Sequence, residues 1–135
     1  MKFINKYTSP CFNNRKKGAK ITHVILHYTA MNSDIEAISH LSELKNKVST
    51  HFLINKKGKI IKMVDEKKRA WHAGLSFWKG IRDINSYSIG IELDNSGQNE
   101  YPNLQINSLI NLIKYLKSKY KIKDSEILAH SDISP

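Results

Sequence analysis

The chain has 135 residues, of which 40% are hydrophobic and 25% charged, so it is long enough for one domain with its own core. This composition excludes a disordered tail, a collagen and a coiled coil. Lysine and arginine outnumber the acidic residues by 22 to 12, for a net charge of +10. A polyanionic partner and a lysine-rich solvated surface both explain this excess. Because arginines are few, we do not expect nucleic acid as the partner.

No apolar run approaches the roughly 20 residues of a membrane-spanning helix. The first residues lack the apolar stretch, roughly 7–15 residues long, of a secretory signal. The single cysteine, Cys11, cannot form a disulfide within the chain, which fits a reducing compartment. We therefore expect a cytoplasmic protein without a membrane span, and the sequence leaves its oligomeric state open.

The N-terminal third predicts an arm, a strand and a helix. Residues 1–19 are polar and are typical of an extended arm. Residues 20–29 are nearly continuously apolar, which predicts a central strand buried on both faces. Ser33 then precedes Glu36 by three residues, a pattern that caps a helix start. An amphipathic helix over residues 34–46 follows from apolar side chains at helical spacing, namely Ile35, Ile38, Leu41 and Leu44.

The middle of the chain predicts a hairpin and a long loop. Two short apolar runs, residues 50–54 and 60–64, flank a connection that contains a glycine, which predicts a β-hairpin. Residues 65–85 show no periodicity and hold both tryptophans, so we expect a functional loop there.

The last third predicts two strands and a helix. Residues 86–93 are typical of a strand, in which Gly90 would allow another group to approach the backbone closely. Apolar residues at helical spacing predict a helix over residues 105–120, and residues 126–130 predict a final strand. Together these elements predict the α/β class, with a mixed central β-sheet flanked by helices.

Two histidines, His27 and His130, end two of the predicted strands. The ends of strands in α/β sheets are where ligand sites form. Either histidine alone is explained as well by a buried side chain whose hydrogen bonds are satisfied. His40, in contrast, falls on the predicted helix, where we expect it at the surface.

Glu92 lies between two isoleucines of a predicted central strand. A carboxylate in such a place is costly unless it is paired or takes part in chemistry. Burial would raise its pKa, as a general acid or base requires. A salt bridge to one of the many lysines is the alternative interpretation.

An aromatic-rich loop surrounds Trp71. It reads Ala-Trp-His-Ala-Gly over residues 70–74, and Trp78 follows. Loops of this kind bind sugars or peptides by stacking, while the small residues leave room for the ligand. A loop held in place by tryptophans packed in the core is the alternative.

In their order along the chain, these segments resemble the zinc-dependent N-acetylmuramoyl-L-alanine amidases of the type-2 amidase family. That family also includes phage T7-type lysozymes and peptidoglycan recognition proteins, and the chain looks most like its cytosolic anhydro-muramyl-peptide branch. The resemblance covers nearly the whole chain. It is carried by residues 9–10, 13–15, 24–29, 48–54, 69–74, 83–85, 88–92 and 129–135.

The resemblance implies one amidase domain over residues 1–135, with the mixed sheet of that family. It implies a bound zinc ion held by His27 and His130, with Glu92 as the catalytic carboxylate. The implied reaction is hydrolysis of the amide between N-acetylmuramic acid and L-alanine in muropeptides, during cell-wall recycling or turnover. Substrate contacts would come from Tyr28, His51, Trp71, His72 and Ala73.

The chain departs from the family pattern after His130. The family's third zinc ligand is an Asp about ten residues after the second His. This sequence ends at Pro135, and Asp132 lies too close to His130 for that position. We therefore expect the C-terminal metal-ligand segment to be missing, through trimming, natural shortening or replacement by a ligand from elsewhere. A zinc amidase is the main hypothesis, a peptidoglycan-fragment binding module the alternative, and a basic nucleic-acid or polymerase-binding protein the third.

Overall fold

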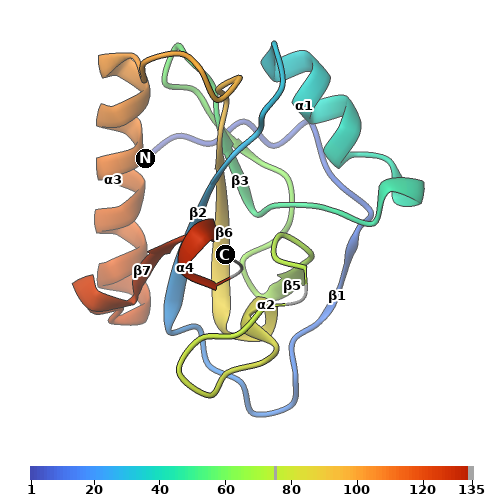
Figure 1. The fold of residues 1–135 in the computed structure, drawn as a ribbon, viewed down its shortest axis with the longest axis vertical. Helices are drawn as coiled ribbons and strands as arrows, with labels where there is room; N and C mark the ends of the chain where they lie inside the picture. Colours follow the sequence, from blue (N-terminus) through green and yellow to red (C-terminus); the bar gives the residue numbers. More distant parts are fainter. Residues whose placement is uncertain (75, 134–135) are drawn as a thin grey trace.

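A five-stranded mixed sheet forms the centre of the molecule, with strand order β4-β3-β6-β2-β7 (Figure 1). The computed structural model describes residues 1–74 and 76–133. β3, β6, β2 and β7 run parallel, and β4 pairs antiparallel with β3. The predicted α/β class with a mixed central sheet is therefore confirmed. The strands are β2 (His23–Tyr28), β3 (Phe52–Ile54), β4 (Ile60–Lys62), β6 (Ser88–Leu93) and β7 (Ile127–Ala129).

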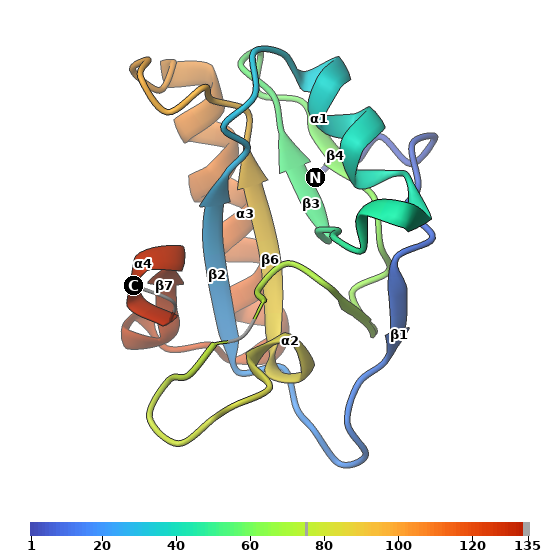
Figure 2. The same ribbon diagram turned by 45° about the vertical axis from the view of Figure 1, so that its right-hand side comes forward.

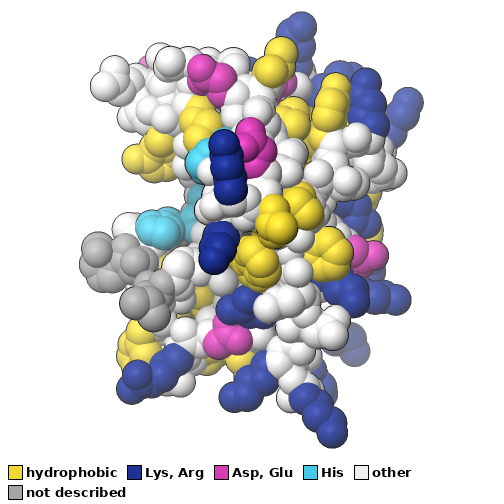
Figure 3. All heavy atoms as spheres, turned by 90° about the vertical axis from the view of Figure 1, so that its right-hand side faces the viewer, with side chains coloured by type: hydrophobic (Ala, Val, Ile, Leu, Met, Phe, Trp, Pro, Cys, Tyr) yellow, Lys and Arg dark blue, Asp and Glu magenta, His cyan; other side chains and the backbone are white. Residues whose placement is uncertain are grey.

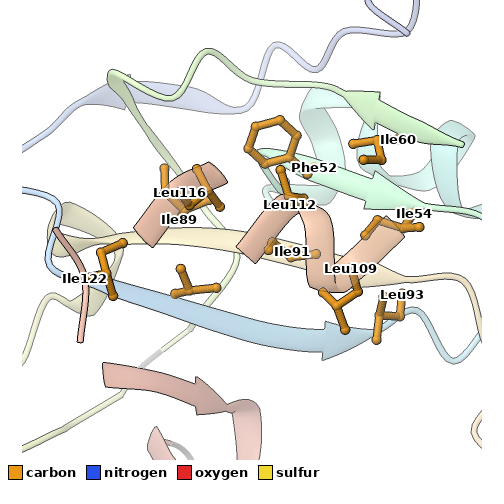
Figure 4. Close-up of a cluster of buried hydrophobic side chains, with 11 residues drawn as sticks. Phe52, Ile54, Ile60, Ile89, Ile91, Leu93, Leu109, Leu112, Leu116 and Ile122 are labelled. Carbon is orange, nitrogen blue, oxygen red and sulfur yellow. The ribbon is translucent and has the colours of Figure 1, made fainter. Parts of the chain in front are cut away.

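One long helix, α3 (Asn103–Tyr120), covers one face of this sheet (Figure 1). Because side chains alternate along a strand, every second residue of β2, β3 and β6 points toward α3. The main core lies between them, as Figure 4 shows for Phe52, Ile91 and Leu112. Within the described part of the chain, no helix is long and apolar enough to cross a membrane.

The opposite face of the sheet carries shorter elements and smaller apolar clusters (Figure 2). The helix α1 (Asp34–Leu41) packs Ala37 and Leu41 against the hairpin. The other helical segments described are single turns. They are η1 (Leu44–Asn46), α2 (Ile84–Tyr87), η2 (Asp124–Glu126) and α4 (His130–Ile133).

The N-terminal arm contributes β1 (Phe12–Asn14), which pairs antiparallel with β5 (Lys68–Ala70). Next to it, the guanidinium of Arg15 donates to the backbone carbonyls of Asn85, Ser86, Ser88 and Glu66. The prediction that residues 65–85 hold only a loop was wrong at β5. This strand carries no apolar period because it pairs with the arm, away from the core, and buries only Ala70.

Most predicted elements are present, with different ends. The Glu36 N–H donates to Ser33 Oγ at 3.1 Å, which confirms the predicted helix cap. The helix itself ends at Leu41, five residues before the predicted end at residue 46. The Ser42 hydroxyl donates to the Ile38 carbonyl, and the Leu44 side chain, 58% exposed, adds no core contact that would extend the helix. The hairpin is confirmed. The helix expected over residues 105–120 begins at residue 103, and residues 86–87 belong to α2 rather than to β6.

Candidate active site

Polar side chains meet on the sheet face opposite α3. β2 and β6 pair in parallel so that His27 lies directly beside Glu92. β7 pairs with the other side of β2, and His130 follows its last residue. All three side chains thus lie at the carboxyl ends of neighbouring parallel strands, where α/β sheets build ligand sites.

The imidazoles of His27 and His130 face each other through their Nδ1 atoms, which lie 3.1 Å apart. Two nitrogens bound to one tetrahedral zinc at roughly 2.0–2.1 Å lie about 3.3 Å from each other. Burial and the neighbouring His130 lower the pKa of His27 to about 4, so its imidazole is neutral. Neutral imidazole nitrogen is the form that binds zinc, and the pair therefore fits two of its ligands.

A third ligand is not grouped with this pair. Within residues 1–74 and 76–133, no three His, Cys, Asp or Glu side chains are placed to hold a metal ion together. Asp132 lies exposed on α4, where its Oδ2 accepts the Ala129 N–H at 2.8 Å. The described residues therefore supply two ligands of the expected zinc.

Glu92 is a buried carboxyl group, with only 8% of the residue exposed. Its carboxylate forms no hydrogen bond or ion pair with any described residue, so the alternative of a lysine salt bridge is wrong. Burial raises its pKa to about 8. A carboxyl group of this kind both takes and releases a proton near neutral pH, as a general acid or base must.

A cavity of about 360 Å³ opens over these groups, within the size range of small-molecule sites. Figure 3 shows histidine side chains at a hollow of the surface. Its lining includes the polar side chains of His27, Glu92 and His130. The remaining lining residues are Tyr28, Thr29, Ala30, Met31, Ala37, His40, Leu41, Val48 and His72.

His40 lines this cavity, although the sequence interpretation placed it at the surface. It lies three residues after Ala37 and one before Leu41, both of which face the sheet. Residues three and four apart share a helix face. That spacing was the signal that could have identified His40.

A second, shallower recess of about 540 Å³ lies beside Trp71 and Ala73. The indole Nε1 of Trp71 donates to Asn13 Oδ1 at 3.2 Å, so this half-buried ring is fixed to the arm. The Asn85 side chain bonds both the N–H and the carbonyl of Ala73, at 3.0 and 2.7 Å. The predicted loop residues therefore form a rigid wall around an open recess.

Two predicted substrate residues, His51 and His72, lie inside the protein instead. His51 is 0% exposed; its Nδ1 accepts the Gly90 N–H, and its Nε2 donates to the Lys68 carbonyl. His72 is 5% exposed and reaches the cavity wall, but both ring nitrogens contact protein groups. Neither imidazole has a free nitrogen for a substrate, and the role of the two residues in substrate binding stays a prediction.

The close approach predicted at Gly90 is confirmed, and the approaching group is the His72 ring. A Cβ added at Gly90 would lie 2.4 Å from His72 Cγ. No carbon atom fits at that distance, so only glycine leaves room for the ring against β6.

The sequence of this chain is similar to those of known amidases. The family model described as N-acetylmuramoyl-L-alanine amidase matches residues 17–134. The N-acetylmuramoyl-L-alanine amidase AmiD of Escherichia coli is 38% identical over 133 residues, covering 86% of this chain and 47% of AmiD. The 1,6-anhydro-N-acetylmuramyl-L-alanine amidase AmpD of Haemophilus influenzae is 31% identical over 145 residues, covering 94% of this chain and 79% of AmpD. The chain thus spans about half the length of AmiD.

Solved structures show the same fold. A crystal structure of an AmpD derivative matches with a TM-score of 0.87 at 24% identity, over 98% of this chain and 83% of that one. Escherichia coli AmiD in complex with anhydro-N-acetylmuramic acid-L-Ala-D-gamma-Glu-L-Lys matches with a TM-score of 0.78 at 34% identity. That match covers 90% of this chain and 53% of the AmiD chain.

Proposed function

This chain belongs to the N-acetylmuramoyl-L-alanine amidase family, and on that premise we propose that it hydrolyses the amide between N-acetylmuramic acid and L-alanine in peptidoglycan fragments. The observation that carries the proposal is the arrangement of His27, His130 and Glu92 in one cavity. The muropeptide bound in the AmiD complex supports an anhydro-muropeptide as substrate. A role in cell-wall recycling and a cytoplasmic location belong to the same proposal.

His27 and His130 would hold the zinc ion through their facing Nδ1 atoms. When bound, zinc supplies Lewis-acid chemistry, polarising a carbonyl and lowering the pKa of water. Glu92 takes a proton from the attacking water on a carboxylate oxygen and delivers it to the leaving nitrogen of L-alanine. Its buried position, with no described partner, leaves that carboxylate free for both transfers.

The cavity walls supply binding and orientation. Met31, Leu41 and Val48 line the same cavity and offer apolar surface that would exclude water around the scissile amide. Tyr28 is half-exposed at the rim, and Trp71 lies at the neighbouring recess. We assign these two aromatic rings to stacking against the sugar and peptide.

The test is cleavage of anhydro-N-acetylmuramic acid-L-Ala-D-gamma-Glu-L-Lys by the zinc-supplemented chain, with the released tripeptide detected by mass spectrometry. We expect release by the wild type and none by Glu92→Gln. The matched control is Asp94→Asn, which changes a buried carboxyl group two residues away that does not line the cavity. Its activity should stay near wild type.

Two results would contradict the proposal. Equal tripeptide release by Glu92→Gln and wild type would remove Glu92 from the mechanism. Binding of the muropeptide without any cleavage by the wild type would favour the alternative, a peptidoglycan-fragment binding module.

A further inference from the structure

A chain of hydrogen bonds runs along the sheet face opposite α3 toward the candidate site. Ser88 Oγ lies 2.7 Å from the Ile84 carbonyl and 2.9 Å from His72 Nε2. The other nitrogen of that ring, Nδ1, lies 3.0 Å from His27 Nε2. His27 Nδ1 in turn faces His130. Each ring nitrogen of His72 and His27 thus has one defined neighbour.

The direction of these bonds follows from their first member. The Ile84 carbonyl only accepts, so the single hydroxyl proton of Ser88 is donated to it. Ser88 Oγ must then accept from His72, which places the proton of that neutral ring on Nε2. His72 Nδ1 is left as an acceptor and takes the N–H of His27 Nε2.

The geometry points to His72 and Ser88 as positioning residues that fix His27 in the Nε2–H tautomer, with its Nδ1 lone pair turned toward His130. This inference deepens the proposed function, on which its relevance to zinc rests, because it names what prepares one zinc-binding nitrogen. A metal-ligating histidine generally donates its second ring N–H to a partner that sets its orientation. Here the partner is another imidazole, whose own tautomer is set by a serine.

Packing holds His72, the central ring of the hydrogen-bonded set Ser88, His72 and His27 (the relay), in place. His72 is almost fully buried and rests on the backbone of Gly90, which lies between Ser88 and Glu92 on β6. A neutral, sterically fixed ring has one donor and one acceptor, as the relay requires.

The direct test reads the tautomers of metal-free wild-type protein at pH 8, from long-range proton–nitrogen spectra of ¹⁵N-histidine-labelled chain. We expect His27 and His72 to carry their protons on Nε2. His51 is the internal reference, because the Gly90 N–H donates to its Nδ1 independently of the relay. A proton on Nδ1 of His27 would overturn the inference.

Variants then test the coupling to zinc. Ser88→Ala removes the acceptor that sets His72, so the tautomers of both rings should become mixed and zinc affinity should fall by roughly 10–100-fold. Ser86→Ala is the matched control, because Ser86 is equally buried and bonds Asp83 outside the relay. Unchanged tautomers and zinc affinity in Ser88→Ala would contradict the relay.

Substitutions of His72 separate its hydrogen bond from its bulk. In His72→Asn the side-chain oxygen still accepts from His27 Nε2, so the His27 tautomer and zinc affinity should stay near wild type. In His72→Leu no acceptor remains, so the His27 tautomers should become mixed and zinc affinity should fall. Because the spectra need neither metal nor substrate, a wild type that binds no zinc would refute the zinc proposal and leave this inference standing. Normal zinc binding together with a His27 proton on Nδ1 would refute this inference and leave the zinc proposal standing.

Discussion

Glu92→Gln should change how the stability of the metal-free protein depends on pH. The ordinary pKa of this carboxyl group is 4.5, and burial raises it to about 8 in the folded protein. At pH values between these two pKa values, the carboxyl group is protonated in the folded protein but ionised in the unfolded protein. Its ionisation therefore opposes folding, and stability is lost as pH rises through this window. Glutamine keeps the shape of the protonated form and has no charge to lose.

The size of the effect follows from the two pKa values. The full difference between 4.5 and about 8 corresponds to about 5 kcal/mol of unfolding free energy. At pH 5, close to the unfolded-state pKa, ionisation of the unfolded carboxyl group lowers the unfolding free energy by only about 1 kcal/mol. At pH 9 nearly all of it is present. Relative to wild type, Glu92→Gln should therefore gain about 4 kcal/mol between pH 5 and pH 9.

Urea unfolding of both proteins at one-unit intervals from pH 5 to 9, with a chelator present, measures this difference. Ionisations common to both proteins cancel in it. Glu100→Gln, the same change at an exposed position, sets the baseline. A difference between Glu92→Gln and wild type that stays flat with pH would refute the argument that Glu92 is a buried carboxyl group without a partner.

Three further variants test separate features. Gly90→Ala should destabilise the protein by about 2–3 kcal/mol in urea unfolding, since its Cβ overlaps the His72 ring, whereas Gly74→Ala, with no described atom within 4 Å, should be nearly neutral. Burial alone would raise the pKa of Glu66, but hydrogen bonds from tyrosine and lysine lower it. Glu66→Gln should therefore reduce the unfolding free energy by about 2 kcal/mol at pH 7, and this difference from wild type should disappear as the pH falls below 4.5. A difference in unfolding free energy that persists in acid would contradict this account. Trp71→Ala should weaken muropeptide binding about tenfold by calorimetry on catalytically inactive protein, and unchanged affinity would remove this ring from the binding surface.

The parts of the site that the sequence revealed are those set by local pattern. Strand ends are visible as the limits of apolar runs, so His27 and His130 could each be placed at the end of a strand. Glu92 was identifiable because a carboxylate among isoleucines needs a special reason. Gly90 was identifiable because a strand interior disfavours glycine unless something approaches it.

The parts that could not be predicted depend on contacts distant in sequence. The burial of His51 and His72 arises from contacts with β6 about 40 and 16 residues away along the chain, which no local pattern shows. β5 pairs with the arm, so it has no apolar period to reveal it. The early end of α1 depends on Ser42, whose hydroxyl competes for a backbone carbonyl that periodicity does not show.

The central claim is that the facing nitrogens of His27 and His130 form a zinc site, and zinc binding tests it most directly. A chelator-competition titration of the untagged wild type should show about one zinc per chain. That binding should be lost in His27→Ala and in His130→Ala, and retained in His40→Ala, which lines the same cavity away from the pair. No zinc bound by the wild type, or equal binding by His27→Ala, would contradict the account.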